Sequence, residues 1–356
     1  MTKYIYFILV FALVCTLTET AQAGNPDRQG EAGAFELLMM PWARSAGLHS
    51  MNTANVSGVD ALRLNVAGAA RVNKTQVNLG YAEYLQGSGI SMNAFGLSQK
   101  VGENGAIAFS VMSLDFGDIA VTTTDQPEGT GANYSPSFIN IGVGYSHVFE
   151  NKVSVGVLFR GVSEGVADLR ASTFAVDAGV QYVTGEEDNF KLGISLRNVG
   201  GTLRFQGEGI VRSVEIPTGG DSYNLAIEER TAEFELQSQL NIGASYDFRF
   251  SDAHRVTLIG NFTSNAFSQD QFGAGLEYSL KDIFILRGAY RYEVGSSNIN
   301  EAPLYTGLAG GFSLQLPLNK EAKDEGLFGT QVSIDYAYRD SKILGGTHNI
   351  GLRFDL

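Results

Sequence analysis

The chain has 356 residues, a net charge of −13, 44% hydrophobic and 18% charged residues, and one cysteine. The acidic balance excludes a basic nucleic-acid-binding surface, and a single thiol excludes an intrachain disulfide or a cysteine cluster for a metal. The mean hydropathy of −0.02 is too polar for a bundle of membrane helices. It fits strands whose apolar and polar faces cancel.

Residues 1–23 have the pattern of a secretory signal peptide, because an apolar run follows a lysine and Ala21-Gln22-Ala23 forms a cleavage motif. A membrane anchor helix is one alternative, but the apolar run Tyr4–Leu17 is short for a span. A lipoprotein anchored through Cys15 is another, which the preceding Val14 disfavours. The leader therefore predicts export from the cytoplasm.

Residues 24–73 lack the alternation of strands and contain clusters of small residues and a Met-rich apolar piece. This composition predicts short helices and turns. We expect the segment to form a plug inside the lumen of a barrel or at its periplasmic mouth. A separate periplasmic domain is the alternative, and the segment is too short to bury a core of its own.

Residues 74–356 predict a transmembrane β-barrel. In the run Phe234–Phe250 every second residue belongs to a largely apolar set and the residues between them are polar or glycine, over about twice the length of a soluble strand. Strands in lipid need about 9–11 residues with one apolar face. The same reading gives about fourteen antiparallel strands: Gln76–Leu85, Gly89–Val101, Gly105–Phe116, Ser137–Phe149, Lys152–Val162, Ala171–Val183, Phe190–Val199, Glu233–Phe250, Arg255–Ser264, Gln271–Leu280, Ile283–Val294, Leu304–Leu316, Gln331–Arg339 and Thr347–Leu356.

Loop lengths support this strand count. Short polar turns fall on one side by parity, whereas the two longest loops, Gly117–Pro136 and Gly200–Ala232, fall on the other. Outer-membrane barrels have short periplasmic turns and longer extracellular loops. We therefore expect both termini in the periplasm of a Gram-negative bacterium and the barrel wall in outer-membrane lipid and lipopolysaccharide. The stretch Asn319–Phe328 is long for a periplasmic turn.

No catalytic, cofactor-binding or metal-binding motif is visible. The histidines His49, His147, His254 and His348 lie on different segments without ligand spacing. A barrel hydrolase would need a cluster of Ser, His and an acid, which the spacing does not show. The polar phase of the later strands carries lumenal charges, which form either a structural ladder of ion pairs or a selectivity field: Arg287, Arg291, Asp335 and Arg339.

The loop Gly200–Ala232 contains many apolar residues for an extracellular loop. Such residues require burial, either on the rim of the barrel itself or against a partner protein. The candidates for partner binding are Phe205, Ile210, Val211 and Ile216.

Four pieces of residues 24–73 resemble the PorV/PorQ family: Gly33-Ala34-Phe35-Glu36-Leu37-Leu38, Ala43-Arg44-Ser45-Ala46-Gly47-Leu48, Gly58-Val59-Asp60-Ala61 and Asn65-Val66-Ala67-Gly68. The plug motif consists of Arg44, Gly47, Asn65 and Gly68. Val66 replaces a usual proline and His49 a common glycine. The resemblance implies a FadL-like fold and a non-enzymatic role in type IX secretion, with the translocon, cargo signal domains or attachment-complex proteins as partners.

The sequence therefore favours a non-catalytic barrel of type IX secretion without a cofactor. The alternative is a FadL-type transporter of hydrophobic small molecules across the outer membrane. An apolar pocket between plug and wall would favour transport. A solidly packed lumen with apolar outer loops would favour partner binding.

Overall fold

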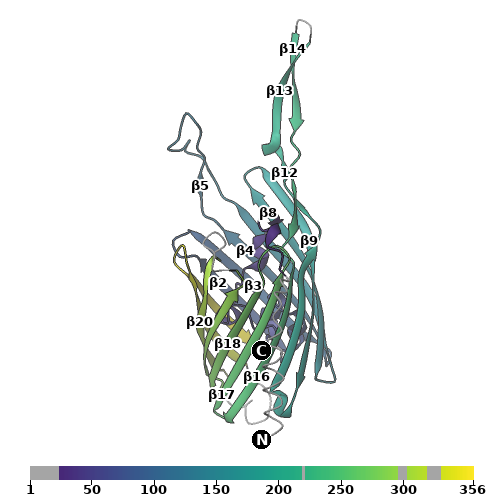
Figure 1. Cartoon of the computed structure of the whole chain (residues 1–356), viewed down its shortest axis with the longest axis vertical. Helices are drawn as coiled ribbons and strands as arrows, with labels where there is room; N and C mark the ends of the chain where they lie inside the picture. Colours follow the sequence, from purple (N-terminus) through teal and green to yellow (C-terminus); the bar gives the residue numbers. More distant parts are fainter. Residues whose placement is uncertain (1–23, 219–220, 296–302, 319–329) are drawn as a thin grey trace.

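A computed structural model describes residues 24–218, 221–295, 303–318 and 330–356, which form a closed antiparallel β-barrel (Figure 1). The barrel strands are β2 (Thr75–Tyr84), β3 (Ile90–Val101), β4 (Gly105–Asp115), β7 (Ser137–Phe149), β8 (Val153–Val166), β9 (Leu169–Thr184), β10 (Phe190–Gly200), β16 (Gln239–Ser251), β17 (His254–Asn265), β18 (Gln271–Leu280), β19 (Phe284–Glu293), β20 (Tyr305–Pro317), β21 (Gln331–Ser341) and β22 (Thr347–Asp355).

Pairing between the strands closes the sheet. The ordered sheet has 15 members, of which the two-residue β12 (Gln206–Gly207) only extends one edge of β9. The other fourteen close on themselves because β10 pairs with both β9 and β16. The first and last strands are neighbours, with Gln76 opposite Asp355. The predicted fold class and strand number are confirmed.

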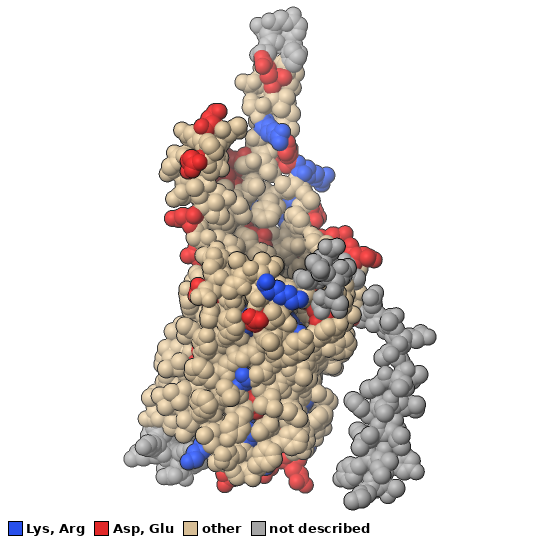
Figure 2. Space-filling model, turned by 60° about the vertical axis from the view of Figure 1, so that its left-hand side comes forward, with Lys and Arg blue, Asp and Glu red and all other residues tan. Residues whose placement is uncertain are grey.

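Side chains alternate between the two faces of the wall. On neighbouring strands Ile194, Ile242 and Leu258 point outward with 52, 43 and 46% of their surface exposed, whereas Ser195 and Asn241 point inward and are buried. In Figure 2 few charged groups are visible over the middle of the barrel, and most acidic groups lie toward its two ends. An apolar outer face over a polar inner face is the arrangement of a barrel in lipid.

One predicted strand is wrong. The run predicted as Glu233–Phe250 is two elements, because the chain turns at Gln237 and the Ser238 amide donates to the Leu236 carbonyl (2.8 Å). The first element, β15 (Glu233–Leu236), lies beside β1 (Ala32–Gly33) and β11 (Leu203–Arg204) rather than in the barrel. Leu236 is buried there. The alternation runs unbroken through the turn, so the pattern alone did not reveal it.

The two ends of the barrel differ. Short turns join the strands at one end, called the turn end, and the two long loops lie at the other, called the loop end. At the loop end the hairpin β13 (Val211–Thr218) and β14 (Asp221–Glu228) projects beyond the barrel in Figure 1, as does the arm that contains β5 (Ile119–Ala120) and β6 (Asn133–Tyr134). The predicted signal peptide and the stretch 319–328 lie outside the described residues.

Residues 24–73 lie largely within the barrel. After η1 (Pro26–Arg28) the segment forms short helical turns: η2 (Phe35–Leu38), α2 (Ala43–Ala46), η3 (Gly58–Arg63) and η4 (Val66–Ala70). These turns contact strands on several sides of the wall, and nearly all side chains from residue 37 to 70 are buried. We call residues 24–73 the N-terminal segment. No helix among the described residues is long and apolar enough to cross a membrane.

Candidate functional site

Asn65 of the predicted plug motif joins the N-terminal segment to the wall. The Asn65 amide donates to the carbonyls of Thr53 (3.1 Å) and Val180 (3.0 Å), and its oxygen accepts from the Ala67 amide (3.2 Å). Gly179 on β9 leaves room for it, since a Cβ there would lie 2.0 Å from the Asn65 oxygen. Gly68 allows a close approach within the segment itself, because a Cβ there would lie 2.1 Å from the Val56 carbonyl oxygen.

The other two motif residues lie near α2. A Cβ on Gly47 would meet the Gly311 Cα at 3.3 Å and the Ala337 Cβ at 3.4 Å, so the glycine allows close approach to β20 and β21. Arg44 donates to Ser57 Oγ (3.4 Å) and faces the turn-end part of the lumen. Of the four motif residues, Asn65 and Gly47 therefore contact the wall, whereas the contacts of Arg44 and Gly68 lie within the segment.

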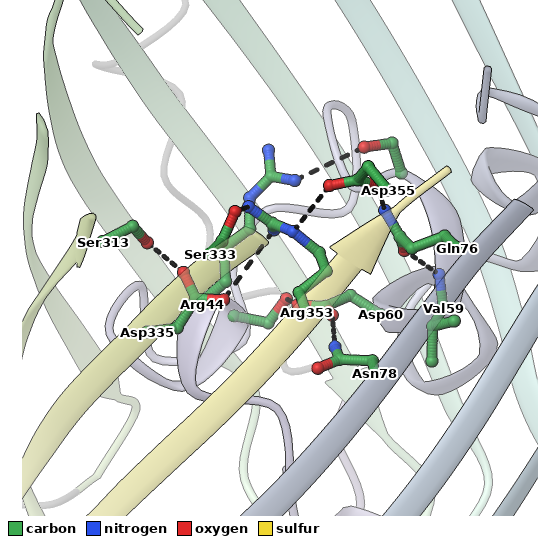
Figure 3. Close-up of polar contacts among 12 residues, drawn as sticks. Arg44, Val59, Asp60, Gln76, Asn78, Ser313, Ser333, Asp335, Arg353 and Asp355 are labelled. Carbon is green, nitrogen blue, oxygen red and sulfur yellow. Dashed lines mark hydrogen bonds and ion pairs between the residues drawn. The ribbon is translucent and has the colours of Figure 1, made fainter. Parts of the chain in front are cut away.

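A polar network joins the segment to the seam between β2 and β22 (Figure 3). Asn78 donates to Asp60 Oδ1 (3.0 Å), and Ser45 donates to the other oxygen of Asp60 (2.7 Å). Gln76 accepts from the Val59 amide (2.7 Å) and donates to Asp355 (2.6 Å). Segment, first strand and last strand are thus held together where the barrel closes.

Several lumenal charges form ion pairs within the wall. Arg287 Nε lies 2.5 Å from Glu277, and Arg353 lies 3.3 Å from Asp355 and 3.9 Å from Asp335. All are largely buried, and Asp335 also accepts from Ser313. Two of the predicted lumenal charges, Arg287 and Asp335, therefore belong to ion pairs within the wall.

The sequence prediction missed another buried pair on the opposite wall. Arg160 on β8 contacts Asp177 on β9 at 2.8 Å and donates to the Leu62 carbonyl of the segment (2.8 Å). Arg197 on β10 donates to the Leu37 carbonyl (3.1 Å) and to Gln239 (3.3 Å). Each of these charged residues belongs to the alternate set of its strand that points into the lumen. The alternation along the strands would therefore have predicted them as lumenal.

Two cavities lie at opposite ends of the N-terminal segment. The loop-end cavity has a volume of about 260 Å³ and the turn-end cavity about 250 Å³. The loop-end cavity is lined by Phe35, Leu38, Met39, Ser50, Tyr84, Arg197, Gln239, Asn241, Thr263, Asn265, Ser268, Gln271, Arg291, Tyr305 and Arg339. The turn-end cavity is lined mainly by polar and charged groups, among them Arg44, Arg71, Lys191, Asp247 and Glu277. The segment therefore separates two spaces that open toward different ends of the lumen.

The loop-end cavity has two unlike sides. The N-terminal segment contributes Phe35, Leu38 and Met39, which form an apolar surface. The wall contributes amides, hydroxyls and arginines. Small-molecule sites usually combine an apolar lining with a few converging polar groups. A transporter is expected to have an apolar pocket between the plug and the wall. This cavity lies between the two, but its lining is mixed rather than apolar.

Arg291 and Arg339, two more predicted lumenal charges, both reach this cavity. They stand on β19 and β21, on either side of Tyr305 of β20. The register of β20 shifts between Tyr305 and Ala309, where Gly307 has a φ of 95° that favours glycine. This bulge places the Tyr305 ring 5.0 Å from the Arg339 guanidinium carbon.

His49 is buried next to this group and packs edge-on against Tyr305, with ring centroids 5.6 Å apart. Neither ring nitrogen has a hydrogen-bond partner in the described part of the chain. Burial lowers the pKa of His49 well below its ordinary value, and the positive charges of Arg291 and Arg339 lower it further. The imidazole is therefore neutral at pH 7.

The segment also carries a buried acid. Glu36 accepts from the Asn140 amide (3.1 Å) and makes a carboxyl–carboxyl contact with Glu164 of β8. Burial raises the pKa of Glu36 above its ordinary value, although hydrogen bonds and the charge of Arg63 oppose the shift. Two adjacent carboxyls share a proton more readily than they both ionise.

The four predicted partner-binding residues lie in two different settings. Phe205 is half-buried against the cluster that contains Leu203 and Leu236, so it belongs to the rim packing. Val211 and Ile216 belong to the projecting hairpin, and Ile210 immediately precedes it. The structure therefore places Phe205 in the rim packing, and partner binding by the other three stays a prediction.

No group of three or more His, Cys, Asp or Glu side chains that could hold a metal ion occurs within the described ranges. The three remaining histidines contact tyrosine hydroxyls: His147 with Tyr145 (3.3 Å), His254 with Tyr278 (2.7 Å) and His348 with Tyr336 (2.8 Å).

The fold is similar to that of several solved barrels. No protein-family model and no curated protein matches the sequence. The P. putida toluene transporter TodX superposes with a TM-score of 0.52 at 13% identity, covering 87% of this chain and 96% of that one. The CymD monoaromatic hydrocarbon channel gives 0.52 at 15% identity, covering 90% and 97%. The Ralstonia pickettii toluene transporter TbuX gives 0.51 at 13% identity, covering 88% and 97%.

The fold is FadL-like. The fold expected from the resemblance is thereby confirmed. At these identities the likeness concerns the fold, and function has to be argued from the lumen and the loops.

Proposed function

We propose that this protein is a non-catalytic channel of the Gram-negative outer membrane that admits small hydrophobic molecules. The observation that carries the proposal is the loop-end cavity, where the apolar residues Phe35, Leu38 and Met39 of the N-terminal segment face the wall. The solved barrels of the same fold support it, since their names describe toluene transporters and a monoaromatic hydrocarbon channel.

In this proposal the loop end is extracellular, and the turn end and both termini are periplasmic. The outer wall contacts membrane lipid and lipopolysaccharide. A solute would enter the loop-end cavity and pass the N-terminal segment, which separates it from the turn-end cavity.

Uptake by intact cells tests this function, because the lipopolysaccharide leaflet hinders hydrophobic solutes. We expect the protein to raise the initial uptake rate of radiolabelled toluene in a host without FadL-type barrels. Thr263→Trp, which fills the loop-end cavity, should reduce the rate, whereas Asn104→Trp at an exposed turn should not. A folded barrel that leaves uptake at the host's background would refute the proposal.

The projecting hairpin favours a second candidate function, that of a type IX secretion component. Its cross-strand pairs put apolar residues on one face, opposite a face that carries Ser213, Glu215 and Asn224. The apolar face contains Val214, Ile216, Tyr223, Leu225 and Ile227, and Arg212 lies at its base opposite Ile227. Four of the apolar residues are 40–52% exposed. A lone two-stranded hairpin with one apolar face gains stability when a partner covers that face.

The second candidate is tested by Val214→Ser/Leu225→Ser, with Ser213→Ala/Asn224→Ala as the matched control on the polar face. We expect the first variant to lose the translocon, cargo or attachment-complex proteins that co-purify in mild detergent, and the control to keep them. Equal recovery of partners with both variants would exclude the apolar face as their binding site.

A further inference from the structure

The loop-end cavity contains more positive charge than a channel for neutral hydrocarbons requires. Three arginines line it, Arg197, Arg291 and Arg339, and none of its described lining residues is acidic. Glu293 lies on the same face of β19 as Arg291, where it accepts from Gln271 (2.8 Å). Even with this acid included, the cavity has an excess of positive charge.

Arg339 is the least neutralised of the three. It is 4% exposed, and its Nε and Nη2 have no hydrogen-bond partner within the described part of the chain. The Arg339 guanidinium lies over the ring of Tyr305, which is a weak partner for a buried cation. A buried guanidinium without partners is costly.

Glu293 offsets part of the charge of Arg291, and the described lining of the cavity contains no acid of its own. Arg291 is close enough for its charge to act on Arg339, and both act on His49. Arg197 is directed elsewhere, because it donates to Leu37 and Gln239. Arg291 and Arg339 therefore form a cationic pair that faces the cavity, with Tyr305 between their strands.

We propose that the loop-end cavity binds a compact organic acid, with the carboxylate between Arg291 and Arg339 and the apolar body against Phe35, Leu38 and Met39. The inference rests on the proposed function and specifies its substrate class. Arginine matches the geometry of a carboxylate. A volume of about 260 Å³ suits a ring or short chain that carries one acid group rather than a long aliphatic tail.

Calorimetry on the purified barrel in detergent tests the inference with four probes: benzoate, hexanoate, inorganic phosphate and benzyl alcohol. We expect both carboxylates to bind. Phosphate lacks an apolar body and benzyl alcohol lacks a charge, so both should bind at least tenfold more weakly. Phosphate binding as tight as benzoate would overturn the acid-plus-apolar-body assignment, and benzyl alcohol binding as tight as benzoate would overturn the role of the arginines.

Arg339→Gln and Arg291→Gln should each weaken benzoate binding about 10- to 100-fold, the value of a charge-assisted hydrogen bond. Arg249→Gln is the matched control, since Arg249 is exposed at the turn end and pairs with Glu187 (2.9 Å). If Arg339→Gln does not fold, the half-buried Arg291 decides the test. Benzoate affinity that both folded variants retain would refute the site.

This experiment separates the inference from the channel function. Benzoate binding without any uptake by cells would support the site and refute the channel. Uptake of toluene without benzoate binding would support the channel and refute the site.

Discussion

Arginine substitutions along β16 should report the depth of each position in the membrane. Leu240, Ile242 and Ala244 point outward, opposite Leu196, Ile194 and Leu192 of β10. A strand tilted by about 40° climbs about 2.6 Å per residue, so an apolar band of about 25 Å covers about ten residues. With the band centred on Ser245, the three positions lie about 13, 8 and 3 Å from the midplane.

The cost of arginine on the lipid face is about 2–4 kcal/mol at the midplane and about 0–1 kcal/mol near the boundary. We therefore expect about 0–1 kcal/mol for Leu240→Arg, about 1–2 for Ile242→Arg and about 2–4 for Ala244→Arg. Denaturant unfolding of the barrel in phospholipid vesicles measures these values.

The control is Asn241→Arg, which points into the loop-end cavity. It should cost less than Ala244→Arg. Equal costs at the three outward positions, or a control as damaging as Ala244→Arg, would refute a lipid-facing wall in this register.

Three further predictions concern the segment and the topology. Burial raises the pKa of Glu36 in the folded protein above its value in the unfolded chain. Protonated Glu36 therefore stabilises the fold at low pH, and this stabilisation is lost as the pH rises through the pKa of the folded state. Glu36→Gln should remove this part of the pH dependence of stability. Unfolding midpoints at several pH values measure this, and an unchanged profile would contradict it. Gly179→Ala should cost roughly 1–3 kcal/mol through its clash with Asn65, whereas Gly260→Ala, which has no neighbour within 4 Å, should cost less; equal unfolding midpoints would contradict the docking. Cysteines at Thr130 and Asn224 should react with an impermeant reagent on intact cells and cysteines at Asn104 and Asp188 should not; the reverse pattern would invert the proposed orientation.

The strands could be predicted because a barrel in lipid imposes a period of two on its sequence. Outward Leu240 and Ile242 and inward Arg287 and Arg339 all followed from that period. The break at Gln237 did not, since Phe234 and Leu236 keep the same phase while packing against the rim instead of lipid.

The candidate site could be predicted only in part. Strand phase directed Arg291 and Arg339 to the lumen, but the bulge at Gly307 and the cavity left by the segment are properties of the folded chain. The hairpin had a visible signal, because glycines at 219 and 220 separate two apolar runs. The separation of the hairpin into an apolar and a polar face depends on which residues pair across its strands.

If small hydrophobic molecules pass the N-terminal segment in the lumen, as we propose, the segment has to move aside. A disulfide that locks the segment tests it most directly. A Cβ on Gly351 of β22 would lie 3.5 Å from the Ala43 Cβ of α2, which is a distance that a disulfide bridges. Uptake of radiolabelled toluene is then measured in cells that carry Ala43→Cys/Gly351→Cys, with and without reductant, beside the wild-type barrel. We expect slow uptake in the oxidised variant, recovery on reduction and no effect of reductant on the wild type. Equal uptake by the oxidised and reduced variant, with the cross-link formed, would contradict this expectation.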